Sequence, residues 1–444
     1  MKSKILSLLI LFSFVAVNAQ IKKITFEQYK LDNGMNVILH KDNSTPIVAV
    51  TLLYHVGSKN EDPQRTGFAH FFEHLMFEGS KNIPRGEFDK ISQGAGGTNN
   101  ANTNPDRTFY YQIFPSNQLE LALWMESDRL MSLNIDSIGV ETQRKVVKEE
   151  RKQSYDNRPY GTLIEETFKR AYKVHPYRWT TIGNPEDINK ATLQEFIDFH
   201  STYYVPQNVT LSIAGDIDIP KTKELIQKYF SEIPKGTKEI KRPKEVEPDL
   251  GGEVRDIVYD NVQLPLVLHA YRVPAQGTPD SYALEMLAKV LSTGQSSRLY
   301  KELVDKQQKA VVTGSFPYFL EDPGLFLTYG IANIGIKAED LEAAIQTEID
   351  KVKKDLISEK EFQKLRNQKE TEFYTENSSV LGVAENLAQY FVYFGDANLI
   401  NTEIDRYMKV TREDIKRVAN KYLTKENRVV LYYLPKSMKP ADKQ

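Results

Sequence analysis

The chain has 444 residues, with 58 lysines and arginines, 60 aspartates and glutamates, no cysteine and a formal net charge of −2 at pH 7. The interspersed charges exclude a nucleic-acid-binding stripe and a polybasic membrane patch. The absence of cysteine excludes a disulfide framework, a lipid-anchored cysteine and a thiolate metal ligand. A chain this long exceeds what one hydrophobic core usually serves, so we expect two domains.

The first residues have the pattern of a secretory signal peptide. Two lysines precede an apolar run from Ile5 to Val17, and cleavage is expected after Ala19. The run is shorter than the ~20 residues that span a bilayer, and no later apolar stretch is long enough either. We therefore expect a soluble, exported mature chain without a membrane span, most simply in a bacterial periplasm.

The mature chain is predicted to open with strands. Residues 26–31 and 36–40 flank an Asp-Asn-Gly turn and indicate a hairpin, and residues 47–56 indicate a further strand. A polar loop over 57–65 then leads into a helix that begins at about Thr66.

That helix carries a His-x-x-Glu-His motif formed by His70, Glu73 and His74. Residues four apart on a helix have Cβ atoms ~6 Å apart, so both imidazoles can reach one zinc ion at the usual ~2.0–2.1 Å. Glu73 flanks the same face, where it can contact a metal-bound water. Gly79 is a natural stop for the helix. The alternative is an amphipathic helix that carries these residues by chance.

Strands and helices continue beyond the motif. A short helix is expected near Phe88, before a glycine-rich break. Residues 99–103 and 108–114 indicate two antiparallel strands, and helices are predicted over 119–131 and from about 140 to 155.

The last of these helices is expected to carry a third metal ligand, because zinc held by two histidines normally takes one more protein ligand and keeps one position for water. Val146 and Val147 mark its predicted buried face. Glu150 projects from that face, where an unpaired carboxylate is costly, whereas Glu149 is turned toward solvent. The spacing leaves open a second interpretation, in which both glutamates are solvated.

The second half of the chain repeats the first in outline. A helix over 219–229 is predicted to close the first domain, and the Lys-, Glu- and Pro-rich segment 235–252 is typical of a linker. A strand over 264–272 and a helix over 281–291 follow, without histidines in the helix. The remaining predicted elements are a helical region over 338–394, a helix over 413–422 and a strand over 428–433.

Several motifs are similar, in chain order, to the inverted-zincin pattern of the pitrilysin family, which includes insulin-degrading enzyme and the mitochondrial processing peptidases. They are His70-x-x-Glu73-His74, Gly96-Gly97, Asn100-Ala101-x-Thr103, Val147-x-x-Glu150, His175-Pro-Tyr177, Gly183, Tyr204-x-Pro-x-Asn208 and Gly215-Asp216. The resemblance covers essentially the whole mature chain. It is greatest to short bacterial members that resemble the beta subunit of a mitochondrial processing peptidase.

The resemblance implies an α+β fold of two homologous domains, each a largely antiparallel sheet covered by helices, which together form half of a peptide-enclosing chamber. The expected division is a signal peptide over 1–19, an N-terminal catalytic zinc domain over 20–234, a linker over 235–252 and a C-terminal domain without metal over 253–444.

The resemblance also implies a zinc metallopeptidase. His70, His74 and Glu150 would bind Zn²⁺, and Glu73 would be the general base.

The resemblance implies as well that an extended substrate peptide adds to the sheet edge. The substrate-binding strand would contain Asn100, Ala101 and Thr103.

One departure from the family pattern concerns the second half. Members that act alone or as homodimers carry an arginine and a tyrosine seven positions apart after a Ser-Ser-Arg-Leu-Tyr segment. This chain has the segment at Ser296–Tyr300, but the expected pair falls on Val304 and Val311. Arg298 and Tyr300 have the wrong spacing to replace it and are expected to be structural. The departure favours a hetero-dimer with a related chain that supplies the pair, and a homodimer is the alternative.

We therefore predict an endopeptidase or oligopeptidase that hydrolyses unstructured peptides as the metal-bearing subunit of a two-subunit enzyme. Two alternatives belong to other classes: a non-catalytic scaffold subunit of a peptidase complex, and a peptide-binding module whose zinc is purely structural. The intact set of His70, Glu73, His74 and Glu150 argues against the scaffold subunit. The intact general-base position Glu73 argues against a purely structural zinc.

Overall fold

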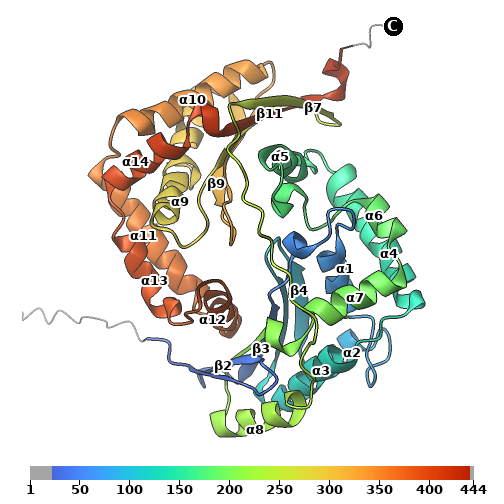
Figure 1. Cartoon of the computed structure of the whole chain (residues 1–444). Helices are drawn as coiled ribbons and strands as arrows, with labels where there is room; N and C mark the ends of the chain where they lie inside the picture. Colours follow the sequence, from blue (N-terminus) through green and yellow to red (C-terminus); the bar gives the residue numbers. More distant parts are fainter. Residues whose placement is uncertain (1–22, 441–444) are drawn as a thin grey trace, which may run out of the picture.

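The structure, a computed structural model, describes residues 23–440. The predicted signal peptide therefore lies outside the described residues. Figure 1 shows two lobes, each built on a β-sheet with helices packed against it. The predicted α+β class, with two helix-covered and largely antiparallel sheets, is confirmed.

The first sheet has, within residues 23–440, six strands in the order β1-β2-β6-β3-β5-β4. Their bounds are β1 Glu27–Lys30, β2 Asn36–Lys41, β3 Ile47–Tyr54, β4 Thr98–Thr103, β5 Thr108–Pro115 and β6 Val209–Gly215. Neighbours are antiparallel except for β2 and β6, which are parallel. β4 is an edge strand, so one side of its backbone is not paired within this sheet.

The second sheet has, in the described part of the chain, five strands in the order β7-β11-β8-β10-β9. Their bounds are β7 Val254–Asp260, β8 Leu266–Arg272, β9 Ala310–Tyr318, β10 Leu325–Ala332 and β11 Arg428–Pro435. β7 is parallel to β11 and the other pairs are antiparallel. Strands β7 to β11 thus repeat, in chain order and direction, the arrangement of β2 to β6.

The helices follow the strands in a similar order in both halves, with five α-helices between the last two strands of each half in the described part of the chain. Those of the first half are α1 Phe68–Leu75, α2 Phe88–Gly94, α3 Leu119–Ser132, α4 Ser137–Arg151, α5 Leu163–Ala171, α6 Pro185–Lys190, α7 Leu193–Tyr203 and α8 Ile219–Phe230. Those of the second half are α9 Pro279–Ser292, α10 Ala338–Lys354, α11 Glu359–Glu376, α12 Val380–Phe394, α13 Leu399–Met408 and α14 Arg412–Tyr422. Helix α9 follows β8 as α1 follows β3, and the predicted helical region over 338–394 consists of three helices.

The two halves exchange one helix each. Helix α12 of the second half packs on β3 and β6 of the first sheet, while α5 of the first half packs on β8 and β11 of the second (Figure 1). Alternation along the strands explains this, because Ala49 and Leu53 of β3 face α12 while Val50 and Leu52 face the helices of their own half. Both sheets are therefore covered on both faces, and the halves are joined by apolar contacts.

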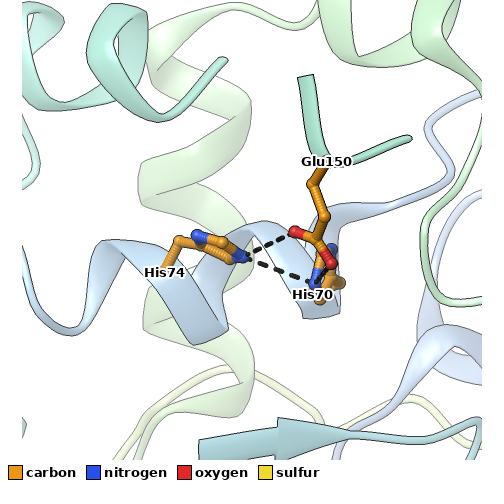
Figure 2. Close-up of side chains that lie close together, drawn as sticks. All are labelled: His70, His74 and Glu150. Atoms are coloured by element: carbon orange, nitrogen blue, oxygen red, sulfur yellow. Dashed lines mark hydrogen bonds and ion pairs between the residues drawn. The ribbon is translucent and has the colours of Figure 1, made fainter. Parts of the chain in front are cut away.

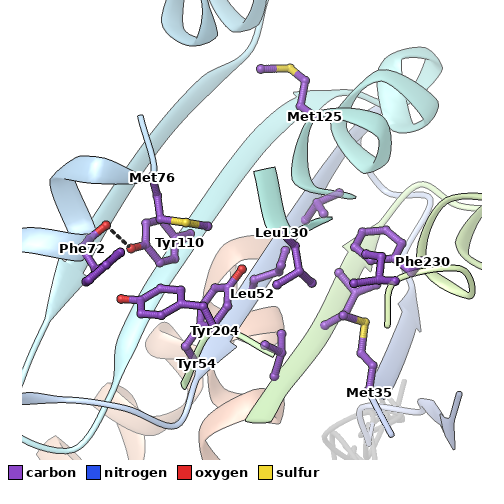
Figure 3. Packing of buried hydrophobic residues seen from close by; sticks show 14 of the residues in the cluster. Met35, Leu52, Tyr54, Phe72, Met76, Tyr110, Met125, Leu130, Tyr204 and Phe230 are labelled. Atoms are coloured by element: carbon purple, nitrogen blue, oxygen red, sulfur yellow. Dashed lines mark hydrogen bonds between the residues drawn. The ribbon is translucent and has the colours of Figure 1, made fainter. Parts of the chain in front are cut away.

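An aromatic cluster supports the helix that carries the motif. Tyr54 and Tyr110 meet edge to face with ring centroids 5.4 Å apart, and Phe72 of α1 lies 5.1 Å from the ring of Tyr204 (Figure 3). The Tyr110 hydroxyl donates to the carbonyl of Phe72 at 3.1 Å. The buried side of α1 is thus fixed, which orients its opposite side.

The predicted linker is not a free spacer. No helix or strand lies between Phe230 and Val254 in this described segment. The Glu247 carboxylate accepts the backbone N–H groups of Lys173 and His175, at 2.7 and 2.8 Å. The segment is therefore bound to the first half along part of its length. Among the described helices, none is both long and apolar enough to span a membrane.

Candidate active site

Helix α1 begins with a buried carboxylate at its first turn. Gly67, with φ of 94°, precedes the helix in the left-handed region that glycine adopts without strain. The buried Glu61 side chain accepts the N–H groups of Gly67 and Ala69, each at 2.8 Å. These donors would otherwise lack partners at the helix start. This contact could not be predicted, because Glu61 lies in a loop whose sequence is that of an ordinary polar connection.

The helix is shorter than predicted at both ends. It spans Phe68 to Leu75 and stops before Gly79. The N–H of Phe77 donates to the carbonyl of His74, three residues earlier. Hydrogen bonds of this 3₁₀ type tighten the last turn and end the α-helix.

Helix α4 brings the distant glutamate to this face. Its start is capped by the Asp136 side chain, which accepts the N–H of Gly139 at 2.7 Å. Val147 is buried as predicted, but Val146 is 44% exposed, so the prediction that both valines mark the buried face is wrong. Consecutive helical residues project in different directions, and here Val147 joins the hydrophobic core of the first half whereas Val146 does not. Glu149 is exposed, while Glu150 is half-buried and points to α1.

Three potential ligands converge between α1 and α4. The Nε2 atoms of His70 and His74 are 3.4 Å apart, and they lie 3.5 and 3.3 Å from the two carboxylate oxygens of Glu150 (Figure 2). All ligand atoms lie within 4.8 Å of one another, and no other such group occurs in residues 23–440. Two imidazoles and one carboxylate are a ligand set of catalytic zinc sites, which keep a position open for water. The residues present therefore fit zinc.

The protonation states also suit a metal. Burial lowers the pKa of His70 to about 4. The hydrogen bond with His74 lowers the pKa of the Glu150 carboxyl. At neutral pH His70 is thus neutral and Glu150 ionised, which are the forms that bind metal ions.

Glu73 lies beside this group without belonging to it. Its Oε2 atom accepts a hydrogen bond of 2.6 Å from the Thr103 hydroxyl of strand β4. Burial raises the pKa of Glu73, and the hydrogen bond from Thr103 opposes that shift. A carboxylate with a raised pKa next to a metal site is suited to accept a proton.

The candidate substrate strand borders the same place. A cavity of about 400 Å³ is lined by Glu73 and His74 on one side and by Asn100 and Ala101 of β4 on the other. Asn100 is exposed, and its side chain accepts the N–H of Ala101 at 2.8 Å. Of the three residues predicted on this strand, Thr103 is the one whose side chain hydrogen-bonds to Glu73.

The segment Ser296–Tyr300 and the two valines that follow it belong to the second half. Arg298 forms two hydrogen bonds with the Glu361 carboxylate, at 3.1 and 3.0 Å. Val304 is half-buried in the second core, and Val311 is 43% exposed on the edge strand β9. Arg298 is therefore occupied within its own half.

Comparisons with known proteins place the chain in a family. The family model described as Insulinase (Peptidase family M16) matches residues 36–184, and the model described as Peptidase M16 inactive domain matches residues 190–369. The chain belongs to peptidase family M16. The predicted pitrilysin-type membership is thus confirmed. The match to the inactive-domain model begins in the first half, at residue 190, and extends into the second half as far as residue 369.

Individual relatives agree with this assignment. The chain is 34% identical over 432 residues to the zinc protease PqqE of Helicobacter pylori, covering 97% of each chain. It is 23% identical to a probable mitochondrial-processing peptidase subunit beta of Arabidopsis thaliana, over 88% of this chain and 75% of that protein. The crystal structure of a protease from Helicobacter pylori superposes with a TM-score of 0.89 at 34% identity, over 93% of this chain and 100% of that one. The predicted zinc metallopeptidase class and Zn²⁺ cofactor are confirmed by this membership together with the His-His-Glu group.

Proposed function

We propose that His70, His74 and Glu150 bind the catalytic zinc and that Glu73 is the general base of peptide-bond hydrolysis. The observation that carries this proposal is the convergence of the three ligands with a second carboxylate, that of Glu73, which lies beside them and is not a ligand. Zinc bound there supplies a water of lowered pKa, ~7, and polarises the peptide carbonyl.

The chain's own groups have the remaining roles. Glu73 takes a proton from the attacking water and returns it to the leaving amine. Thr103 holds the Oε2 atom of Glu73, so that Oε1 is the proton acceptor. An extended peptide adds to the free edge of β4, which orients its carbonyl toward the site. Asn100, Ala101 and Thr103 of that strand are the proposed substrate-binding residues.

The test is a Glu73→Gln variant. It should bind zinc as the wild type does, by metal analysis, and should lose peptide hydrolysis, because the amide cannot accept the proton. Loss of zinc, or retained hydrolysis, would contradict the assigned role. The same variant separates this proposal from the alternative of a purely structural zinc. Under that alternative the wild type has no catalytic activity that Glu73→Gln could lose.

The substrates we propose are unstructured peptides or oligopeptides, because only an extended segment can pair with a strand edge. A folded protein presents few free segments of this kind. The wild type in its active assembly should therefore cleave a denatured protein and leave its folded form intact.

We further propose a two-subunit enzyme in which a related chain supplies an arginine and a tyrosine that this chain lacks. The support is the pair of valines at the expected positions, together with the engagement of Arg298 by Glu361. The purified chain alone should then hydrolyse peptides only weakly, and a related chain that carries the pair should restore activity. Full activity of a homogeneous preparation would favour the homodimer. No activity, either of the chain alone or of the chain with the related chain, would favour a scaffold subunit.

The domain division and the compartment remain our proposals as well. We place the catalytic domain over 20–234, the linker over 235–252 and the second domain over 253–444, with a signal peptide over 1–19 that directs export to the periplasm. Amino-terminal sequencing of the mature protein from a periplasmic fraction tests the last point, with Gln20 as the expected first residue.

A further inference from the structure

The turn between β4 and β5 is buried, although loops ordinarily run over the protein surface. It comprises residues 104–107 and directly follows Thr103, the residue of β4 that hydrogen-bonds to Glu73. Asp106 and Arg107 in this turn are only 2% and 6% exposed. Burial of two charged side chains costs free energy unless both are paired. The partners of these two residues therefore show what holds the turn in place.

The first half of the chain holds one side of the turn. The N–H of Lys59 donates to the carbonyl of Pro105 at 3.0 Å, and the Lys59 ammonium lies 3.0 Å from the Asp106 carboxylate. The Tyr177 hydroxyl donates to the same carboxylate at 2.5 Å. The turn is therefore fixed against two other loops of its own half.

The second half holds the other side of the turn. The backbone N–H of Glu321, in the loop between β9 and β10, donates to the Asp106 carboxylate at 2.9 Å. On α12, the Glu385 carboxylate accepts a hydrogen bond of 2.8 Å from the Arg107 guanidinium. Two separate elements of the second half therefore contact the two buried charges of the turn.

Arg107 extends this contact to the proposed substrate strand. Its Nη2 atom bonds to Glu385, and its Nη1 atom donates to the side-chain oxygen of Asn102 at 2.6 Å. Asn102 is an exposed residue of β4, next to Thr103. Since β4 is an edge strand, its backbone is paired on one side only within its sheet. A single side chain thus connects α12 of the second half to this strand.

We propose that Asp106 and Arg107 are positioning residues through which the second half holds β4 in the place that a substrate peptide needs. A strand that is already ordered loses less conformational entropy when a peptide pairs with it. The inference rests on the proposed function, because it assumes that the peptide adds to β4. The proposed zinc ligands and general base all belong to the first half, so the second half contributes through the position of the strand.

Amide hydrogen exchange of the mature chain tests whether this contact orders β4. Glu385→Ala removes the contact at α12. Asn102→Ala removes it at an exposed residue and keeps the ion pair between Arg107 and Glu385. Either variant should speed exchange over residues 98–108 by roughly tenfold or more, because a hydrogen bond to a charged group is lost. Exchange over residues 27–41 should not change. Unchanged exchange over 98–108 in both variants would overturn the proposal.

Glu361→Ala is the matched control. Glu361 pairs with Arg298 within the second half, and its side chain is 22% exposed, compared with 28% for Glu385. The control variant therefore loses an ion pair of similar burial that does not involve the turn. It should leave exchange over 98–108 unchanged. Equal increases in Glu361→Ala and Glu385→Ala would indicate a general loss of stability and refute the positioning role.

Peptide binding tests whether the order of β4 matters for a substrate. In the zinc-loaded Glu73→Gln parent, the binding of a fluorescein-labelled casein peptide is measured by fluorescence anisotropy. Glu385→Ala should weaken this binding by roughly tenfold or more, because the strand must then be ordered on binding. Glu385→Gln keeps an oxygen that accepts from Arg107, so it should bind nearly as the parent does. Equal affinity of Glu385→Ala and the parent would overturn the proposal.

The same measurements separate this inference from the proposed function. Bound zinc and bound peptide in the parent, without an effect of Glu385→Ala, refute the positioning role alone. A parent that binds neither zinc nor the peptide refutes the proposed function. Hydrogen exchange needs neither zinc nor peptide, so it still decides whether the second half holds β4.

Discussion

Replacement of Thr103 by valine is expected to shift the acidic limb of the pH–rate profile. Its hydroxyl donates at 2.6 Å to the Oε2 atom of Glu73, a half-buried carboxyl whose pKa burial already raises. A hydrogen bond to an ionised group contributes ~1.5–3 kcal/mol, and one pKa unit corresponds to ~1.36 kcal/mol. Loss of the bond favours the protonated form, so the pKa of Glu73 should rise by roughly 1–2 units.

The assay is kcat/KM for a quenched fluorescent peptide between pH 5 and 9, with the zinc-loaded enzyme in its active assembly. A general base must be ionised, so Thr103→Val should lose activity at low pH and recover it as pH rises. Thr103→Ser keeps the hydroxyl and should retain the wild-type profile. A valine variant with an unchanged or acid-shifted limb would refute the reasoning, and a change in KM alone would assign Thr103 to substrate binding only.

Three further predictions concern the metal and the contact between the halves. His74→Ala should reduce zinc content and abolish hydrolysis together, whereas Glu149→Gln, next to a proposed ligand but exposed, should change neither, by metal analysis and peptide assay. The Lys59 ammonium is buried, 3.0 Å from Asp106 of the first half and 2.6 Å from Glu321 of the second. The ion pair with Glu321 therefore joins the two halves. Lys59→Met should therefore cost roughly 3–5 kcal/mol of stability in denaturant unfolding, and a loss below about 1 kcal/mol would contradict a contribution of this size. Burial by itself would raise the pKa of Glu321. The hydrogen bonds and charges of His55 and Lys59 outweigh this effect and lower the pKa to about 2. This lowered pKa stabilises the folded state at pH values above about 4.3, the ordinary pKa of a glutamate, and the stabilisation is lost as the pH falls toward 2. The unfolding temperature of the Glu321→Gln variant should therefore fall less on acidification than that of the wild type.

The sequence predicted those parts of the site that depend on local spacing. His70, Glu73 and His74 share a helix, so their common face follows from 3.6 residues per turn. Glu150 was different, because spacing on α4 left its solvation open and only the family resemblance joined it to the histidines. The error at Val146 has the same origin, since helical periodicity cannot decide which of two adjacent apolar residues is covered by another element.

Contacts between distant segments could not be predicted. Nothing in the periodicity of α5 or α12 indicates that each covers the sheet of the other half. The hydrogen bond from Thr103 to Glu73 and the burial of Asp106 and Arg107 likewise depend on how separate elements pack. Alternation and turns predicted the strands of the amino-terminal sheet up to β5 and also β8 and β11, but β6, β7, β9 and β10 were not predicted. The duplication was visible because both halves place a strand, a loop and a helix in the same order.

The most direct test of the central claim is a crystal structure of the zinc-loaded chain with anomalous data collected at the zinc absorption edge. The account predicts one strong peak within ~2.0–2.2 Å of the Nε2 atoms of His70 and His74 and of a Glu150 carboxylate oxygen, with Glu73 outside bonding distance of the metal. A peak elsewhere, or a zinc ion that Glu150 does not bind, would contradict it.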